Sequence, residues 1–266
     1  MSQQLGFDFS LHARNAGFAK KGMSQTYKKT GTTITACIFD GGVVLGADTR
    51  ATAGPIVMVK DEFKVHYIAD NIWCCGAGTA ADNDYITEMC SAKLRLFKMN
   101  TGMQPRVEQA ATILVNKLFN YGGYISAALI LGGVDHNGPA VYNISPDGCI
   151  AKLPFATMGS GMYAAMSVME QRWRPKMTEE DAMELVADAI EAGITNDLGS
   201  GSNVNLCVIT DKGHRYLSNY KTTNERPFRI TEPVQNLEVS IISQTVRPLC
   251  LPEVHLEILD DAPATE

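Results

Sequence analysis

The chain has 266 residues and a formal net charge of −6, with 45% hydrophobic and 20% charged residues. This balance is close to the average for globular proteins and can build a sizeable core in one large domain or two small ones. The longest nearly apolar run, 125–131, is far short of the roughly 20 residues that a membrane helix needs, so we expect no membrane partner. Residues 1–31 carry five basic groups against one acidic group, which leaves 18 basic and 28 acidic residues in the remainder. Such an acidic body argues against nucleic acid as a partner.

The chain has seven cysteines, an odd number with no CxxC pair, and most of them lie in apolar, strand-like segments. We expect reduced, buried thiols in the cytoplasm or nucleus rather than a disulfide framework or a zinc site. The five histidines show no metal-ligand spacing. We therefore expect neither a metal nor an organic cofactor.

Four segments at the start of the compact region have the alternation of strands: 33–39, 43–47, 63–68 and 72–75. Asp40-Gly41 is a strong hairpin signal between the first two, and we expect a loop around Gly54-Pro55. A Gly-x-Gly turn at 76–78 then opens a helix from about residue 79 to 99. Pro105 suits the first position of a second helix, because its fixed φ is already helical there.

The same order then repeats. Further strands are predicted at 127–134, at 140–144, after the turn at 147–148 and at 155–158. A second Gly-x-Gly turn at 159–161 opens a helix, another helix starts near Thr178, and strands at 204–210 and 214–217 follow. Each sheet face must be covered. Two such units therefore predict an α+β fold, a four-layer α-β-β-α sandwich of two antiparallel sheets.

The two ends of the chain have a different composition from this region. By composition alone, the basic, acid-poor leader is a mitochondrial transit peptide, a propeptide or a disordered arm. From about residue 221 the chain holds five of its eleven prolines. An apolar segment broken by prolines cannot form its own core, so we expect this tail to lie on another surface.

The junction between Gly31 and Thr32 allows two interpretations. A Gly-Thr-Thr sequence is usually just the start of a strand, because threonine suits a pleated sheet. Alternatively, cleavage at this bond would make Thr32 an N-terminal nucleophile. No histidine-based triad is evident, and a terminal α-amine, with an ordinary pKa of about 7.7–8.0, can act as the base. A nearby lysine would lower the proton affinity of that amine.

Other motifs are weak when each is taken alone. Asp48 ends an apolar strand, where an aspartate most often forms a turn, and Lys64 is an isolated cation that could simply face solvent. Both Gly-x-Gly turns also match the start of a dinucleotide-binding motif. They lead into paired helices, however, and the first has no acidic residue about 20 positions on, which disfavours that reading. Glycine turns can still present N–H groups to an oxyanion.

Four motifs, taken together and in order, resemble one known family. They are TGTTI (30–34), GADTRAT (46–52), CCGAGTAAD (74–82) and NDLGSGSN (196–203). These segments resemble the proteasome beta subunits, and specifically their trypsin-like catalytic class. The resemblance covers about residues 6–220, including leader residues 6–9 and 14–16, and it favours a propeptide over a transit peptide.

The resemblance implies an N-terminal-nucleophile hydrolase fold and a set of catalytic roles. Thr32 would be the nucleophile after autocatalytic scission of Gly31–Thr32, with Asp48 and Lys64 as a charged pair beside it. The backbone N–H of Gly78 would stabilise the oxyanion. Three further residues would support the terminal amine and the catalytic water: Ser160, Asp197 and Ser200.

The resemblance also implies a substrate pocket that selects basic residues. Gly76, which has no side chain, would leave the pocket for the substrate's P1 residue open. Asp84 would receive an arginine or lysine, with Glu62 and Asp82 as weaker candidates, although for Asp82 we favour a role in complementing the helix dipole. The remaining candidate substrate-binding residues are Arg50, His66 and Ala80.

At the level of the whole chain, the resemblance implies three segments. These are a propeptide (1–31), a catalytic domain (32–220) and a C-terminal extension (221–266) that packs on a neighbouring subunit. The partners would be other proteasome alpha and beta subunits in stacked seven-membered rings, and the substrates unfolded polypeptides. The alternatives are an unprocessed, non-catalytic ring subunit of the same fold and a free monomeric amidohydrolase.

Overall fold

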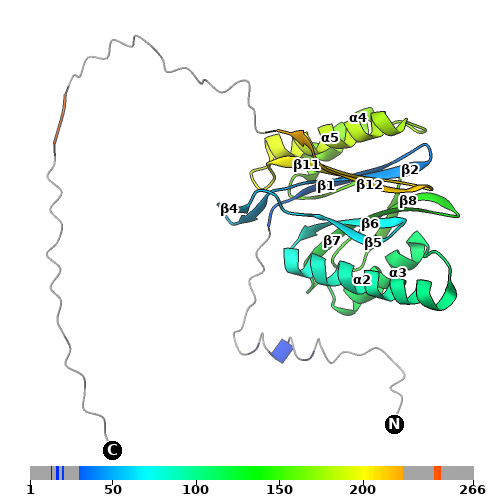
Figure 1. Ribbon diagram of the computed structural model, residues 1–266. Helices are drawn as coiled ribbons and strands as arrows, with labels where there is room; N and C mark the ends of the chain where they lie inside the picture. Colours follow the sequence, from blue (N-terminus) through cyan, green and yellow to red (C-terminus); the bar gives the residue numbers. More distant parts are fainter. Residues whose placement is uncertain (1–12, 14–15, 18–19, 21–29, 224–242, 247–266) are drawn as a thin grey trace, which may run out of the picture. The chain divides into compact units, whose positions relative to one another are not determined.

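The computed structural model describes residues 13, 16–17, 20, 30–223 and 243–246 (Figure 1). The leader motif at 6–9, most of that at 14–16 and nearly all of the predicted extension 221–266 therefore lie outside the described residues. The predicted division at 31/32 and 220/221 stays a prediction. Strand β12 continues to Thr222, two residues past the second boundary.

Two five-stranded antiparallel sheets form the centre of the molecule (Figure 1). The first has the order β10-β1-β2-β11-β12. Its strands are β1 (Thr33–Phe39), β2 (Gly42–Asp48), β10 (Phe155–Gly159), β11 (Asn203–Thr210) and β12 (Gly213–Thr222). The second has the order β5-β6-β7-β8-β9. Its strands are β5 (Val65–Ala69), β6 (Ile72–Gly78), β7 (Ala127–Asp135), β8 (Gly138–Ile144) and β9 (Ile150–Leu153).

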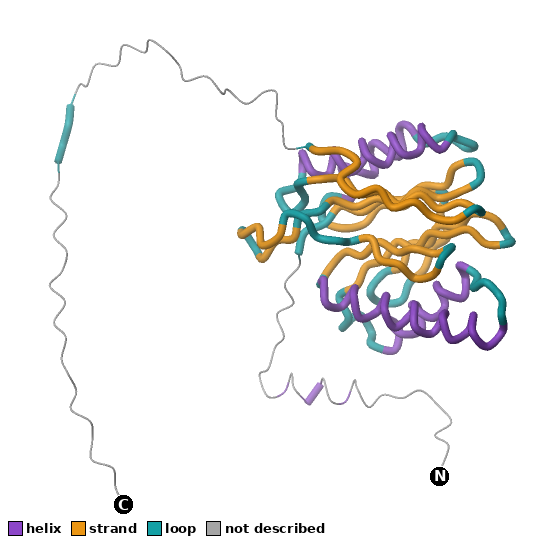
Figure 2. The backbone as a smooth tube through the Cα atoms, in the orientation of Figure 1, coloured by secondary structure: helices purple, strands orange, loops and turns teal. Residues whose placement is uncertain are grey.

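Helices cover the outer faces of both sheets, so the molecule has four layers (Figure 2). Helices α2 (Ala80–Thr101) and α3 (Val107–Asn120) cover the second sheet, and α4 (Met162–Arg172) and α5 (Glu179–Asn196) cover the first. A third apolar cluster fills the space between the sheets and includes Ile34, Leu45 and Ile130. The predicted α-β-β-α sandwich is confirmed.

Burial on both faces explains why the inner strands read as nearly continuous apolar runs rather than as strict alternation. All seven residues of β2 are buried, as are six of the seven in β1. The register pairs Ile34 with Ala47 across these two strands. The start of β1 therefore lies beside the end of β2, and the candidate site is at this edge of the sheet.

Two sequence predictions are wrong in detail. The expected loop around Gly54-Pro55 is a small hairpin of β3 (Ala51–Ala53) and β4 (Ile56–Val59), and all four residues of β4 are exposed. Helix α3 begins at Val107 rather than at Pro105. The Asp135 carboxylate accepts from Val107 N at 3.0 Å, and Gln109 Oε1 accepts from Arg106 N at 2.9 Å. These two hydrogen bonds cap the helix at Arg106, so its first residue is Val107.

Six of the cysteines lie in the described part of the chain, and none of these six forms a disulfide. Five are buried as predicted, whereas Cys149 is exposed in a turn, and Cys250 lies outside the described residues. Burial raises the pKa of Cys37, Cys90 and Cys207 to about 12 each, which keeps these thiols protonated. Among the described helices, none is both long and apolar enough to cross a membrane.

The packing of α3 on the second sheet gives a stability prediction. Leu114 is fully buried in the core under α3, whereas Leu96 on α2 is 60% exposed. Leu114→Ala should lower the free energy of unfolding by about 2–5 kcal/mol, because it leaves a cavity. Leu96→Ala should change it by no more than about 0.5 kcal/mol. Urea unfolding of the purified variants measures both, and equal losses would contradict this placement of the core.

Candidate active site

Thr32 lies immediately before β1, at the edge of the inter-sheet core, and is only 3% exposed. Its backbone N–H donates to Ser160 Oγ at 3.0 Å. Its hydroxyl donates to the carbonyl oxygen of Gly31, the group that precedes it in the chain. The peptide bond between the two residues is intact, so the Thr32 nitrogen is an amide here and not an amine.

Gly31 holds this geometry because its backbone turns through the left-handed region, at φ +64°. A Cβ at this position would collide with the backbone of Gly199. Only glycine satisfies both conditions, which gives a physical reason for the glycine before the threonine. The turn folds the Gly31 carbonyl back towards the Thr32 hydroxyl.

A buried ion pair also contacts the Gly31 carbonyl oxygen. Lys64 Nζ donates to Asp48 Oδ1 at 2.8 Å and to the Gly31 carbonyl oxygen at 3.0 Å. Asp48, at the end of β2, also accepts from the backbone N–H groups of Thr33 at 2.8 Å and Gly201 at 3.1 Å. These contacts tie the charged pair to the start of β1 and to the loop after α5.

Burial governs the protonation of this pair. Loss of hydration lowers the pKa of the Lys64 ammonium below its ordinary value, and the attraction of Asp48 only partly opposes that shift. Burial likewise raises the pKa of the Asp48 carboxyl, against the charge and hydrogen bond of Lys64 and the N–H groups of Thr33 and Gly201. A lysine with a lowered pKa can exchange a proton more readily with a group beside it.

A second polar cluster connects to the Thr32 nitrogen. Asp197 Oδ2 accepts from Ser160 Oγ at 2.6 Å and from Ser200 Oγ at 2.7 Å. Ser200 Oγ also lies 2.7 Å from Thr33 Oγ1. Burial alone would raise the pKa of Asp197, but the hydrogen bonds from the two serines outweigh it and lower that pKa. Asp197 is therefore a stable carboxylate, one serine away from the Thr32 nitrogen.

The residue before Gly31 lies between two strands, like a short added strand. Thr30 N and Oγ1 donate to the Gly78 carbonyl oxygen at 3.3 and 2.8 Å. The Thr30 carbonyl oxygen in turn accepts from Thr52 N at 2.8 Å and from Thr52 Oγ1 at 3.1 Å. Strand β3 and the end of β6 therefore form a cleft that holds the Thr30 backbone beside Thr32, with Gly78 in its wall.

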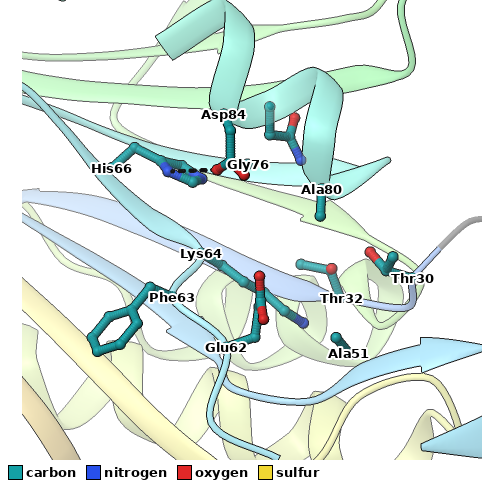
Figure 3. A pocket seen from close by; sticks show the side chains of 11 residues that line it. Thr30, Thr32, Ala51, Glu62, Phe63, Lys64, His66, Gly76, Ala80 and Asp84 are labelled. Atoms are coloured by element: carbon teal, nitrogen blue, oxygen red, sulfur yellow. Dashed lines mark ion pairs between the residues drawn. The ribbon is translucent and has the colours of Figure 1, made fainter. Parts of the chain in front are cut away.

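A pocket opens beside this cleft (Figure 3). It is lined by Thr30, Thr32, Ala51, Glu62, Phe63, Lys64, His66, Gly76, Ala80, Asn83 and Asp84. His66 Nδ1 lies 3.6 Å from Asp84 Oδ1, with the His66 side chain 16% and the Asp84 side chain 59% exposed. Burial lowers the pKa of His66, although Asp84 and Glu88 act in the opposite direction. The neutral form of His66 is favoured.

The structure brings most of the sequence-predicted site residues together. Five of the seven substrate-binding candidates line the pocket: Glu62, His66, Gly76, Ala80 and Asp84. Two candidates are not among its lining residues. Asp82 accepts from Ser126 N at 2.9 Å, and Arg50 Nη1 donates to the Leu198 carbonyl oxygen at 3.2 Å. Asp82 also lies in the first turn of α2, where its carboxylate complements the helix dipole as considered from sequence.

Sequence reasoning missed several residues of this region, including Thr30 and Ala51 in the lining of the pocket. Thr52 binds the Thr30 backbone, Phe63 and Asn83 line the pocket, and Thr33 joins Asp48 to Ser200. Helical spacing could have found Asn83, because it lies three residues after Ala80 on the first turn of α2. The others follow only from how the chain folds. Among the described residues, no group of three or more His, Cys, Asp or Glu side chains could hold a metal ion.

The fold and this site together define an N-terminal-nucleophile hydrolase type of protein. A family model described as proteasome subunit matches residues 28–209. Proteasome subunit beta type-7 of Dictyostelium discoideum is 53% identical over 246 residues, which is 92% of each chain. Proteasome subunit beta type-7-B of Arabidopsis thaliana is 54% identical, over 84% of this chain and 82% of its own. Proteasome subunit beta type-10 of Mus musculus is 43% identical over 92% of each chain. The chain belongs to the proteasome subunit family, and the relatives it resembles are beta subunits.

The buried ion pair gives a prediction about stability. Asp48→Ala should lower the free energy of unfolding by about 3–5 kcal/mol, because it leaves the Lys64 charge buried without a partner. The exposed pair of Lys98 and Asp70, 2.7 Å apart, offers a matched comparison. Asp70→Ala should cost at most about 1 kcal/mol.

Urea unfolding measures both variants, together with the double variant Asp48→Ala, Lys64→Met. Removing the unpaired Lys64 ammonium as well should recover part of the lost free energy of unfolding. A double variant that is less stable than Asp48→Ala alone would contradict the assignment of the loss to an unpaired ammonium.

Proposed function

We propose that this chain is a threonine endopeptidase subunit that cleaves itself between Gly31 and Thr32 and then uses Thr32 as an N-terminal nucleophile. The observation that carries the proposal is the shared Gly31 carbonyl. The Thr32 hydroxyl donates to its oxygen, and Lys64 Nζ lies 3.0 Å from the same oxygen. A nucleophile and a positive charge thus meet at one carbonyl group.

Self-cleavage begins when Thr32 Oγ1 attacks the Gly31 carbonyl carbon and loses its proton. Lys64 is placed to stabilise the negative charge that develops on the carbonyl oxygen. The C–N bond then breaks and the nitrogen takes up a proton, which leaves an ester between Gly31 and the Thr32 side chain. Water hydrolyses this ester, so the leader departs as a carboxylate and Thr32 gains a free amine.

The mature site repeats the same acyl transfer on a substrate. The new amine takes the proton of the Thr32 hydroxyl, with its proton affinity lowered by the nearby Lys64 charge. Ser160, Asp197 and Ser200 hold the amine and its water in place through the hydrogen bonds described above. The substrate backbone lies in the cleft that Thr30 occupies here, and the Gly78 N–H stabilises its oxyanion.

Specificity for basic P1 residues rests on the charge of the pocket. Glu62 and Asp84 line it together with Gly76, which adds no side chain to the pocket (Figure 3). A long cationic side chain can enter and meet these carboxylates, whereas an acidic side chain is repelled. We therefore propose cleavage after arginine and lysine.

We place the subunit in the proteasome core with other alpha and beta subunits, in stacked seven-membered rings that degrade unfolded polypeptides in the cytoplasm and nucleus. The names of its relatives support membership of that particle. In this arrangement residues 1–31 are the propeptide and 32–220 the catalytic domain. Residues 221–266 would pack on a neighbouring subunit, which suits their proline-rich composition.

Thr32→Ala tests the nucleophile. It should abolish both the removal of residues 1–31 and the cleavage of basic peptide reporters, because no hydroxyl remains to attack. Thr32→Ser keeps a hydroxyl and should retain processing and measurable turnover. Mass spectrometry of the N-terminus in the assembled particle reads out processing. Normal maturation of Thr32→Ala, or retention of the leader in the active wild type, would refute the role of Thr32 and favour a non-catalytic ring subunit.

The acidic pocket is tested with P1 reporters. The wild type should turn over P1 arginine far faster than P1 glutamate. Asp84→Asn should lower kcat/KM for P1 arginine by roughly two- to fivefold, the range of an exposed ion pair. Asp211→Asn, in the turn between β11 and β12, serves as the control and should leave turnover unchanged. Equal wild-type turnover of acidic and basic reporters would overturn the specificity.

A further inference from the structure

Thr33 lies one residue after the candidate nucleophile and contacts both polar clusters of the site. It is fully buried at the start of β1. Its backbone N–H donates to Asp48 Oδ1 at 2.8 Å, and its hydroxyl oxygen lies 2.7 Å from Ser200 Oγ. Neither self-cleavage nor substrate hydrolysis, as proposed, uses this hydroxyl directly. The Thr33 side chain nevertheless joins the strand that follows Thr32 to the loop after α5.

The hydrogen bonds of Ser200 decide which of the two hydroxyls is the donor. Asp197 is a carboxylate and can only accept, so Ser200 Oγ, 2.7 Å from Asp197 Oδ2, donates its single hydrogen to it. In the contact with Thr33, Ser200 can then only accept, and the Thr33 hydroxyl is the donor. The result is a chain of hydrogen bonds that runs from Thr33 through Ser200 to Asp197.

Thr32 reaches the same carboxylate by a matching route. Ser160 Oγ donates to Asp197 Oδ2 at 2.6 Å, so its oxygen can accept from the Thr32 N–H at 3.0 Å. Two consecutive threonines therefore donate to two serines, and both serines donate to one carboxylate oxygen. Hydrogen bonds connected in this way polarise and strengthen one another. A shift of Ser200 would thus reach Ser160 through the shared oxygen of Asp197.

The Thr33 hydroxyl is held in place by close packing. Two glycines lie against it, Gly161 before α4 and Gly193 in α5, and a Cβ on either would collide with Thr33 Oγ1. A glycine inside a helix costs about 1 kcal/mol relative to alanine, so this contact gives a physical reason for Gly193. The backbone is fixed as well, since β1 pairs Thr33 with Gly159 of β10. The hydroxyl is therefore a fixed point from which Ser200 can be positioned.

We propose that Thr33 is a positioning residue: its hydroxyl donates to Ser200 and so keeps the chain of hydrogen bonds aligned with the nitrogen of Thr32. This inference rests on the proposed function, because only scission turns that nitrogen into the amine that acts as base. In the mature site the amine donates to Ser160, whose own hydrogen is committed to Asp197. The amine then keeps its lone pair for the proton of the Thr32 hydroxyl.

The test compares Thr33→Val with Thr33→Ser in assembled particles. Valine keeps the branched shape but has no hydroxyl, whereas serine keeps the hydroxyl. Thr33→Val should lower kcat for a P1 arginine reporter by about two- to tenfold, the effect of one hydrogen bond. It should leave KM unchanged, because Thr33 is not among the residues that line the pocket. Thr33→Ser should recover most of kcat. Thr33→Ala, which also lacks the hydroxyl and takes less space, should show the same loss as Thr33→Val.

Thr35→Val is the matched control. Thr35 lies two residues further along β1, on the same face of the strand, and is equally buried. Its hydroxyl donates to the Ala156 carbonyl oxygen in β10 at 3.1 Å. Thr35→Val therefore removes a buried hydroxyl from the same strand without breaking the chain to Asp197, and it should leave kcat unchanged. Mass spectrometry of the N-terminus counts the mature sites in each particle, so that kcat is compared per mature site.

The outcomes separate this role from the proposed activity. A wild-type kcat in Thr33→Val, an equal loss in Thr35→Val, or a loss that Thr33→Ser shares overturns the role of Thr33 and leaves the protease proposal standing. A Thr33→Val particle that keeps residues 1–31 places the hydroxyl in maturation rather than beside the amine, and it also overturns this role. A wild-type particle that keeps residues 1–31 refutes the protease proposal itself.

Discussion

The buried pair of Asp48 and Lys64 is the interaction on which the rest of the site depends. Asp48 joins β1 through Thr33 N and the loop after α5 through Gly201 N, and it holds Lys64 against the Gly31 carbonyl. The attraction between two buried charges compensates for their lost hydration only if their other hydrogen-bond partners are also in place. The sheet register, the loop position and the orientation of the Gly31–Thr32 peptide bond are thus coupled through one carboxylate.

Much of the fold could be predicted from sequence because local patterns and burial agree. The strands of β1 and β2, the hairpin turn between them and the helices after both glycine turns follow from alternation and helical period. The hairpin of β3 and β4 escaped prediction because Gly54-Pro55 reads as a loop and β4 has no buried face. The start of α3 escaped it because the capping group, Asp135, comes from a distant strand.

The residues of the candidate site likewise include some that could be predicted from the sequence and some that could not. Thr32 and Asp48, which lie in short motifs, and Lys64, an isolated cation between two of them, could be named in advance because the resemblance assigns their roles. Thr33 could not, because an interior threonine is unremarkable until the fold brings Asp48 and Ser200 to it. Arg50 and Asp82 show the converse, since motif positions can hold the scaffold together instead of lining the pocket.

The cleft around Thr30 has a consequence for what the molecule could process. Thr52 and Gly78 grip the main chain of residue 30, in contacts that any amino acid other than proline could largely reproduce. Recognition through such main-chain contacts depends little on side chains, and it needs a segment whose backbone N–H and carbonyl groups are free of helical hydrogen bonds. Selectivity at this site must therefore come from the side chains that line the adjacent pocket rather than from the grip on the main chain.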